Sequence, residues 1–273
     1  MKSAMAATGC VGLLATEEDG DPIPVPSASA ADGGAPFVAV FDPLDGSSNV
    51  AACIPTGTIW GLYRATSDPP ACPGDALQPG AALVAAGYTL YSSATMLVLT
   101  TGGGRGVTGF TLDRDGAGGG GGSGGGAWVA THPSIVCPPR GQFYSLNDAR
   151  FDDWAPPLQA YIAAVRRGRG QSGKQYAARY VCSLVADLHR TLLYGGWAAN
   201  PRSHLRRVYE AAPLALVTEE AGGAATDGEG RVLDVVPTAL HERAPFFAGS
   251  ADDVAELLSY GDVRQGGAKK YDV

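Results

Sequence analysis

A chain of 273 residues, 45% hydrophobic and 17% charged, has enough apolar surface for one large domain or two closely packed ones. Its net charge of −7 provides no attraction for nucleic acid or anionic lipid, and no apolar run approaches the roughly 20 residues that span a bilayer. Five scattered cysteines and a start without a signal-peptide pattern favour free thiols over a disulfide framework, and they predict a cytoplasmic protein.

The first half of the chain predicts a large β-sheet. Residues 11–15 form an apolar run that ends at three acids, residues 17–19, and residues 37–41 form a second run that ends at Asp42. Because neighbouring strands with acidic ends on one side can pool their carboxylates, we expect these acids to lie together. Further strands are predicted at residues 56–63, 84–91, 95–100 and 107–112.

The second of these strands runs into a turn that predicts a metal site. Pro43 favours an extended Asp42, and Gly46 permits the tight reversal that brings Asp45 back beside Asp42. The two carboxylates and the Leu44 carbonyl then converge as hard oxygen ligands, which Mg²⁺ and Mn²⁺ prefer. Carboxylates this close repel one another without a cation, so the cluster itself argues for metal.

Ser47 and Ser48 follow on the same turn, where hydroxyls and successive backbone N–H groups can cradle an anion. An Asp-Pro-x-Asp-Gly stretch also occurs as an ordinary type I turn. The two serines, together with partners further along the chain, favour a phosphate site over that alternative.

A glycine-rich stretch and a change of pattern divide the chain. Residues 116–126 are glycine at all but two positions, which predicts a flexible insertion in a hairpin loop with no role that the sequence defines. After residue 137 the pattern shifts to alternating strands and helices. We therefore predict an N-terminal metal- and phosphate-binding domain at 1–137 and a C-terminal sugar-phosphate-binding domain at 138–273. Helices are predicted at residues 154–167, 179–194, 205–221 and 250–260.

Residues near the starts of three of these helices carry further predictions. Pro213 shortens the regular helix at 205–221, which leaves Glu210 at its start and free to turn inward. Arg179 is expected to open its helix, where the N-terminus also favours an anion. The spacing Ser250-x-x-Asp253 predicts a side-chain cap on the last helix.

The motifs resemble those of class I fructose-1,6-bisphosphatases over nearly the whole chain, from about residue 11 to residue 260. The matching stretches are Glu17-Glu18-Asp19, Phe41-Asp42-Pro43-Leu44-Asp45-Gly46-Ser47-Ser48-Asn49, Gly57-Thr58-Ile59, Leu83-Val84-Ala85-Ala86-Gly87-Tyr88, Tyr144-Ser145-Leu146-Asn147, Ala178-Arg179-Tyr180, Val185-Ala186-Asp187-Leu188-His189-Arg190-Thr191-Leu192, Tyr194-Gly195-Gly196, Tyr209-Glu210-x-x-Pro213 and His241-Glu242-Arg243-Ala244-Pro245. The resemblance implies the layered α/β sugar-phosphatase fold, in which mixed sheets are sandwiched by helices. It also implies a homo-oligomer, either a dimer or a tetramer.

The resemblance implies roles for particular residues. The implied metal ligands, for two or three Mg²⁺ ions with Mn²⁺ as a substitute, are Glu17, Asp42, the Leu44 carbonyl, Asp45 and Glu210. The implied catalytic carboxylates are Glu18 and Asp45. The implied substrate contacts are Asp45, Gly46, Ser47, Ser48, Asn147, Arg179 (supplied by the neighbouring subunit), Tyr180 and His204.

The implied activity is Mg²⁺-dependent hydrolysis of the 1-phosphate of fructose 1,6-bisphosphate to fructose 6-phosphate, in gluconeogenesis or sucrose synthesis. One alternative is a truncated, weakly active or inactive homologue that binds sugar phosphates or joins an oligomer, because the family normally has a long segment before the strand at 11–15. A sedoheptulose bisphosphatase or an inositol-phosphatase-like enzyme is the second alternative.

The pocket for the far phosphate departs most from the family pattern. Arg150 and Asn200 stand where the family has tyrosines, and His204 stands where it has a lysine. A guanidinium binds phosphate bidentately, so Arg150 offers a replacement contact.

Overall fold

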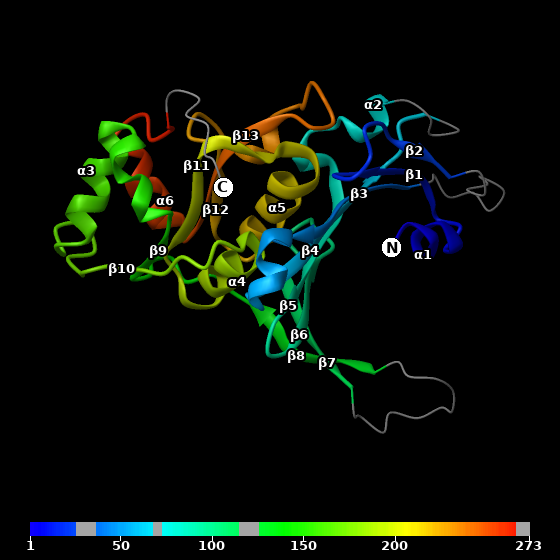
Figure 1. Cartoon of the computed structure of the whole chain (residues 1–273), viewed down its shortest axis with the longest axis horizontal. Helices are drawn as coiled ribbons and strands as arrows, with labels where there is room; N and C mark the ends of the chain where they lie inside the picture. The colour runs from blue at the N-terminus through cyan, green and yellow to red at the C-terminus, as the bar shows by residue number, and fades with distance from the viewer. Residues whose placement is uncertain (26–36, 68–72, 115–125, 266–273) are drawn as a thin grey trace.

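The computed structural model describes residues 1–25, 37–67, 73–114 and 126–265 (Figure 1). The predicted glycine-rich insertion lies outside these ranges apart from Gly126. The four described cysteines are free thiols, as the sequence predicts. No helix in the described ranges is long and apolar enough to cross a membrane.

The first half of the chain forms one eight-stranded sheet in the order β2-β1-β3-β4-β5-β6-β7-β8. Strands β1 and β3 are parallel, and every other neighbouring pair is antiparallel. The predicted strands are confirmed, and the sheet adds β2 and β8. Its strands are β1 (Val11–Thr16), β2 (Ile23–Pro24), β3 (Phe37–Asp45), β4 (Thr56–Arg64), β5 (Leu83–Tyr91), β6 (Thr95–Thr100), β7 (Val107–Asp113) and β8 (Ala127–Ile135).

The second half forms a five-stranded mixed sheet in the order β10-β9-β11-β13-β12. The pairs on either side of β9 are parallel, and those on either side of β13 are antiparallel. Its strands are β9 (Phe143–Ser145), β10 (Ala177–Ala178), β11 (Trp197–Arg206), β12 (Ala224–Thr226) and β13 (Arg243–Gly249). The chain changes from one sheet to the other between residues 135 and 143; the proposed division into domains at residue 137 stays a prediction.

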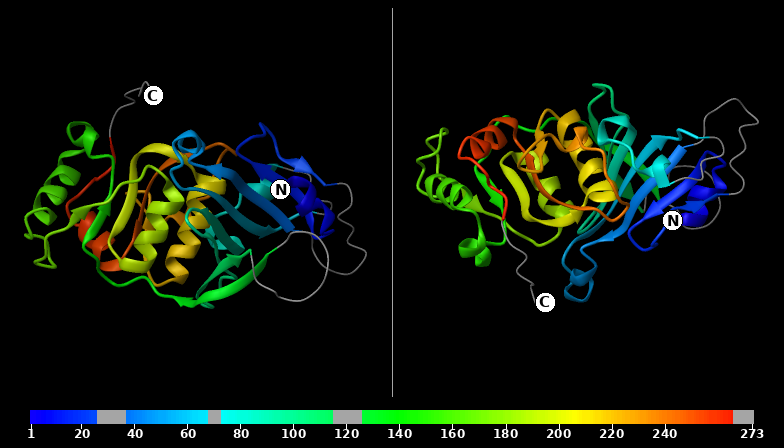
Figure 2. Two further views of the ribbon diagram at one scale, coloured as in Figure 1. Left: turned by 60° about the horizontal axis from the view of Figure 1, so that its bottom comes forward. Right: turned by 90° about the horizontal axis from the view of Figure 1, so that it is seen from above.

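Helices and sheets alternate in layers. Helices α4 (Leu184–Tyr194) and α5 (Ala212–Glu220) lie between the two sheets and contact both (Figures 1 and 2). Helices α3 (Pro156–Val165) and α6 (Ala251–Leu258) cover the other face of the second sheet. Two short helices, α1 (Lys2–Ala7) and α2 (Pro73–Ala76), flank the first sheet. The predicted architecture of mixed sheets sandwiched by helices is confirmed.

The hydrophobic pattern of the helices explains where they pack. In α3 the predicted apolar face is buried against the second sheet, through Leu158, Tyr161, Ile162 and Val165. Helix α5 is buried almost all round because it lies between the sheets, in keeping with its mostly apolar sequence. Burial of this apolar surface is the main favourable contribution to the fold, at roughly 25 cal/mol per Å².

Two helix predictions are corrected by the structure. Helix α4 begins at Leu184, so Arg179 lies outside it in the loop after β10. Cys182 in that loop has a φ of 63°, a left-handed conformation that a helix cannot continue through. Ser250 does not cap α6 with its side chain; its hydroxyl instead donates to Pro138 O at 2.6 Å.

Candidate active site

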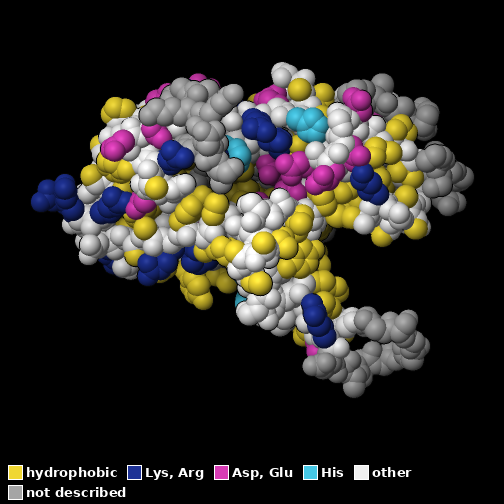
Figure 3. Space-filling view, viewed as in Figure 1, with side chains coloured by type: hydrophobic (Ala, Val, Ile, Leu, Met, Phe, Trp, Pro, Cys, Tyr) yellow, Lys and Arg dark blue, Asp and Glu magenta, His cyan; other side chains and the backbone are white. Residues whose placement is uncertain are grey.

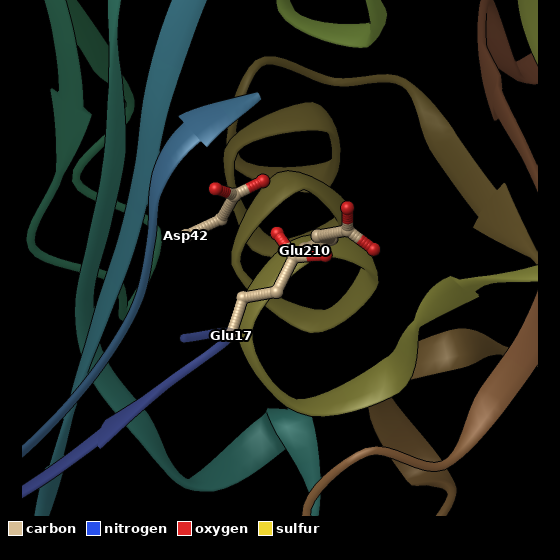
Figure 4. Close-up of side chains that lie close together, drawn as sticks. All are labelled: Glu17, Asp42 and Glu210. Carbon is tan, nitrogen blue, oxygen red and sulfur yellow. The ribbon is translucent and has the colours of Figure 1, made fainter. Parts of the chain in front are cut away.

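Three carboxylates from distant parts of the chain converge beside the first sheet. Oxygens of Glu17, Asp42 and Glu210 lie within 4.8 Å of one another. Glu17 follows β1, Asp42 lies on β3, and Glu210 comes from a π-helical turn (Arg207–Ala211) ahead of α5; the three side chains lie close together (Figure 4). This acidic triad confirms that the ends of the first two strands pool their acids.

The parallel pairing of β1 and β3 explains why Glu17 meets Asp42. Thr16 pairs with Phe41, so the residues that follow them, Glu17 and Asp42, lie side by side at the same end of this strand pair. Glu17 N–H also donates to Phe41 O at 3.4 Å, which holds the segment Glu17–Asp19 (the acidic turn) against β3. Parallel neighbours end on the same side, and the two acids are therefore brought together by register alone.

A bulge in β3 places Asp45. Asp42 pairs with Ile59 of β4 and Asp45 pairs with Gly57, so β3 carries one extra residue across this interval. Leu44 N–H donates to Asp42 Oδ1 at 2.9 Å, which closes the turn. Asp45 is buried and its Oδ2 accepts the Val185 N–H at 3.0 Å, at the N-terminus of α4. Asp45 therefore lies next to the acidic triad and accepts a hydrogen bond from the first turn of α4.

The π-helical turn places Glu210. Its carboxylate accepts the backbone N–H of Arg206, and the Arg206 guanidinium lies 3.6 Å from Glu17 Oε1. The predicted inward turn of Glu210 at the start of the helix is confirmed, since only 8% of the residue is exposed. One arginine thus contacts two of the three acids and offsets part of their charge.

Burial and mutual repulsion raise the pKa of these acids. Burial is the main cause for Asp42, whose pKa rises to about 7, with the charge of Glu17 as the next cause. Burial likewise raises the pKa of Asp45 to about 6 and that of Glu210 to about 8. The raised pKa values mean that the carboxylates favour bound protons over mutual repulsion. A divalent cation can take the place of these protons, and it prefers hard oxygen ligands of this kind.

The acidic triad lines a cavity of about 410 Å³ between the two sheets. Figure 3 shows acidic side chains gathered at the centre of this face, with Lys, Arg and His side chains beside them. Most of the predicted site residues line the cavity: Glu17, Asp42, Leu44, Asp45, Gly46, Ser47, Ser48, Asn147, Tyr180, His204 and Glu210. Glu18 and Arg179 are exposed and do not line it.

The predicted phosphate turn lies against the start of α4. Gly46 has a φ of 76°, the left-handed conformation that the reversal requires, and Ser47 opens a 3₁₀ helix (Ser47–Ala52). Asn49 Nδ2 donates to Cys182 O at 2.7 Å and holds this turn to the segment before α4. The phosphate turn, with its two exposed serines, and the first residue of α4 therefore line one cavity.

Several cavity residues were not among the predicted site residues. Ser183 lines the cavity with a buried hydroxyl that has no hydrogen-bond partner among the described residues. Asp187, also on the cavity wall, accepts the Val181 N–H at 3.1 Å and pairs with Arg190 at 2.9 Å, which orders the loop before α4. Arg202 enters from β11. Asp187 lies in a stretch that resembles the family, 185–192, and Arg202 lies two residues before the predicted His204, whereas no pattern marks Ser183.

Two family models match this chain. The N-terminal domain of fructose-1,6-bisphosphatase matches residues 1–118, and its C-terminal domain matches residues 137–262. The class 1 fructose-1,6-bisphosphatase of Nitratidesulfovibrio vulgaris is 43% identical over 93% of the chain. The chain belongs to the class 1 fructose-1,6-bisphosphatase family. This is a family of phosphoric monoester hydrolases that act in carbohydrate metabolism.

Other fructose-1,6-bisphosphatases agree in sequence and fold. The chloroplastic enzyme of Brassica napus is 39% identical over 94% of the chain. The chain spans 74% of the bacterial relative and 64% of this plant one. The crystal structure of the Leishmania major enzyme in its holo form superposes with a TM-score of 0.82, at 37% identity, over 96% of this chain and 80% of that one. These matches favour fructose-1,6-bisphosphatase over the sedoheptulose bisphosphatase and inositol phosphatase alternatives.

In this family member a chain of hydrogen bonds links the two turns that carry the triad. The hydroxyl of Tyr209, next to Glu210, lies 2.7 Å from His241 Nδ1, and His241 Nε2 lies 3.1 Å from Asp19 O. A carbonyl only accepts, so His241 Nε2 donates to Asp19 O, while Nδ1 bonds the Tyr209 hydroxyl. Thr16 Oγ1 bonds Asp19 as well, at 2.9 Å. The acidic turn and the π-helical turn are thus fixed relative to each other.

Proposed function

We propose that this chain hydrolyses the 1-phosphate of fructose 1,6-bisphosphate to fructose 6-phosphate and inorganic phosphate, in gluconeogenesis or sucrose synthesis. The observation that carries the proposal is the acidic triad in one cavity with the turn at residues 46–48. Three converging carboxylates supply a divalent-cation site, and the turn supplies a phosphate site beside it. Family membership narrows the substrate to a sugar bisphosphate.

The residues that would hold the metal are the triad, Asp45 and the Leu44 carbonyl, with two or three Mg²⁺ ions and Mn²⁺ as a substitute. Bound cations would neutralise the phosphoryl charge, lower the pKa of a bound water and stabilise the leaving oxygen. The chain's own contribution is geometric. Register fixes Glu17 and Asp42, the bulge fixes Asp45, and the π-helical turn fixes Glu210.

The phosphoryl group is proposed to rest on the turn of Gly46, Ser47 and Ser48. Its oxygens would accept hydrogen bonds from the backbone N–H groups and the two hydroxyls, and the N-terminus of α4 faces the same space. Water then attacks phosphorus, the bond from phosphorus to the C1 oxygen breaks, and that oxygen takes up a proton to become the C1 hydroxyl. The products are inorganic phosphate and fructose 6-phosphate.

Of the two proposed catalytic carboxylates, Asp45 is the better placed. Asp45 lines the cavity and is buried, whereas Glu18 is exposed and lies outside it. We assign to Asp45 the orientation of the attacking water and acceptance of its proton. We assign to Glu18 an indirect role, in which it helps to position Glu17, its neighbour in the chain.

The remaining proposed contacts bind the sugar and its far phosphate. Asn147, Tyr180 and His204 line the cavity of this chain. Arg179 does not, and its guanidinium lies over the Phe143 ring at 5.5 Å. We propose that Arg179 reaches the cavity of a neighbouring subunit in a homodimer or homotetramer. Sedimentation velocity is expected to show such an oligomer; a monomer at assay concentrations would contradict this assignment.

The location of the protein is proposed from its relatives. Brassica napus has one relative named as cytosolic and one named as chloroplastic. We propose a cytoplasmic location for this chain, like that named for the cytosolic relative.

Initial rates of phosphate release test the proposed activity. We expect fructose 1,6-bisphosphate to have a higher kcat/KM than sedoheptulose 1,7-bisphosphate or inositol 1-phosphate in millimolar Mg²⁺. Chelation of the metal is expected to abolish release. Faster turnover of either competing substrate, or equal rates with and without Mg²⁺, would overturn the proposal.

A further inference from the structure

Two residues of the matching stretches, Asp19 and His241, take no part in the proposed reaction, although both lie close to the acidic triad in the chain or through a hydrogen bond. Asp19 ends the acidic turn, two residues after Glu17, and its backbone oxygen accepts a hydrogen bond from His241 Nε2 at 3.1 Å. His241 Nδ1 bonds the hydroxyl of Tyr209, the residue before Glu210, at 2.7 Å. A path from one triad residue to another thus runs through one imidazole.

The segment that carries His241 is fixed to the π-helical turn. Its next residue, Glu242, accepts a hydrogen bond from Arg207 Nε at 2.7 Å, and Glu242 O accepts the Arg207 N–H at 2.8 Å. The Glu242 carboxylate also accepts the N–H and the hydroxyl of Thr238, at 2.6 Å and 2.7 Å, which closes the segment on itself. The imidazole is therefore held in the same rigid unit as Glu210.

The acidic turn at the other end of the path is also closed by hydrogen bonds. The Asp19 carboxylate accepts a hydrogen bond from Thr16 Oγ1 at 2.9 Å, and the same hydroxyl oxygen accepts the Glu18 N–H at 3.0 Å. Lys2 of α1 lies 2.5 Å from the Asp19 carboxylate. The turn is therefore held to the end of β1, and the position of its backbone determines the position of Glu17.

A divalent cation makes the relative position of the two turns important. Mg²⁺ binds oxygens at about 2.0–2.1 Å in near-ideal octahedral geometry, and a site must hold its ligands to within about 0.5 Å. Glu17 and Glu210 belong to different turns, yet their oxygens must meet at one ion. Arg206 also spans the gap, but at 3.6 Å from Glu17 it makes an ion pair without the directionality of a hydrogen bond.

We propose that Tyr209 and His241 are positioning residues that set the affinity of the site for divalent cations, by holding the acidic turn at a fixed distance from the π-helical turn. The proposal rests on the proposed function, because Glu17 and Glu210 must share cations for their spacing to matter. Tyr209 and His241 do not line the cavity and act only through the turns. Partners that orient metal ligands in this way are typically worth about 10–100-fold in metal affinity.

The test measures metal binding in the absence of substrate. Metal-free protein is titrated with Mn²⁺, and the electron paramagnetic resonance signal of the free ion gives the dissociation constant. Y209F removes the hydroxyl and keeps the ring, and H241F removes both ring nitrogens. Each variant is expected to weaken Mn²⁺ binding about tenfold or more.

Two further variants separate one path from two independent contacts. Because Tyr209 acts through His241, the double variant Y209F/H241F is expected to bind Mn²⁺ about as tightly as H241F alone. H241Q keeps an N–H at the same number of bonds from the backbone as Nε2, so it is expected to recover part of the affinity that H241F loses. If H241F does not fold, Y209F and H241Q carry the comparison.

Two control variants test for a merely structural effect. The Tyr176 hydroxyl donates to Asp253 at 2.6 Å in the second half of the chain, and neither residue lines the cavity. Y176F therefore removes a comparable hydroxyl, and it is expected to lower the melting temperature without changing the Mn²⁺ affinity. H132Q replaces a half-buried histidine of β8 outside the cavity, and it is expected to keep the affinity of the unaltered protein.

Phosphate release gives a second measurement on the same variants. The Mg²⁺ concentration for half-maximal activity is expected to rise in Y209F and H241F, because the cations bind more weakly. The KM for fructose 1,6-bisphosphate in saturating Mg²⁺ is expected to stay close to that of the unaltered protein, because neither residue contacts the substrate.

The outcomes separate this proposal from the proposed function. Equal Mn²⁺ affinity in Y209F, H241F and the unaltered protein would overturn the positioning role and leave the phosphatase activity standing. Additive losses in the double variant would also overturn it, because residues that act independently add. Weaker Mn²⁺ binding in both single variants of a protein that releases no phosphate would support the positioning role and overturn the proposed activity.

Discussion

The substitution Asp42→Asn is expected to remove most of the rise in melting temperature that Mg²⁺ produces in the unaltered protein. It is also expected to lower kcat about 10²–10⁴-fold, because metal assistance to the reaction is worth several kcal/mol. A ligand that binds only the folded state stabilises it by mass action, so loss of a metal ligand reduces that gain. Asp42 is 2% exposed and belongs to the triad, so the substitution removes a buried carboxylate from the proposed metal site. Differential scanning fluorimetry with and without Mg²⁺ measures the first effect, and phosphate release measures the second.

Asp234→Asn is the matched control for this substitution. Asp234 is an exposed aspartate that pairs with Arg231 at 2.6 Å and does not line the cavity. The control is expected to keep both the Mg²⁺ response and the turnover of the unaltered protein, because a surface ion pair is worth only about 0–1 kcal/mol. An equal Mg²⁺ response in Asp42→Asn and in the unaltered protein would remove the basis for the metal site.

The metal-free protein is expected to lose stability as the pH rises from about 6.5 to about 8.5. In the folded state the pKa of Asp42 is raised from 3.8 to about 7 and that of Glu210 from 4.5 to about 8. The unfolded chain has released both protons by pH 6.5, while the folded state still holds them. Deprotonation within this window therefore favours the unfolded state, by about 2–3 kcal/mol.

The choice of window matters because two histidines act in the opposite sense, mainly below it. Burial lowers the pKa of His189 and of His204 from 6.5 to about 4, so stability from these groups rises with pH until the unfolded chain has released its histidine protons. Above pH 6.5 this release adds only about 0.8 kcal/mol of stability for the two histidines together, which is less than the acids remove, so the acids decide the sign of the slope.

Urea unfolding at pH 6.5 and pH 8.5 in a chelator measures the difference in the free energy of unfolding. Mg²⁺ is expected to reduce the loss, because the cation takes the place of the protons. Glu210→Gln is expected to flatten the metal-free curve, since it removes one of the two ionisations. A metal-free protein that is equally stable or more stable at pH 8.5 would contradict the proposed electrostatics of the triad.

The acidic side of the site could be predicted from the sequence because it depends on local rules. Two apolar runs with acids at their ends predict adjacent strands, and the parallel register of β1 and β3 then brings Glu17 to Asp42. Gly46 signals its own left-handed turn. Pro213 shortens the helix, so that Glu210 turns inward. For Gly46 and Glu210, one or two neighbouring residues determine the local geometry.

Features that depend on long-range contacts could not be predicted in this way. Helix α4 begins at Leu184, five residues after Arg179, because the intervening loop is held by Asp187 and interrupted at Cys182. The exposed strand β8 has no alternating apolar pattern to mark it. The place of Arg202 depends on the register of β11 against β13, which only the folded sheet defines.

Phosphorus NMR of fructose 1,6-bisphosphate incubated with the protein tests the central claim most directly, because it shows which phosphate is lost and whether Mg²⁺ is required. In millimolar Mg²⁺ we expect the 1-phosphate signal to disappear as inorganic phosphate and fructose 6-phosphate form in equal amounts, and we expect a chelator to stop the reaction. Loss of the 6-phosphate, or an unchanged spectrum in Mg²⁺ with folded protein, would contradict the proposed function.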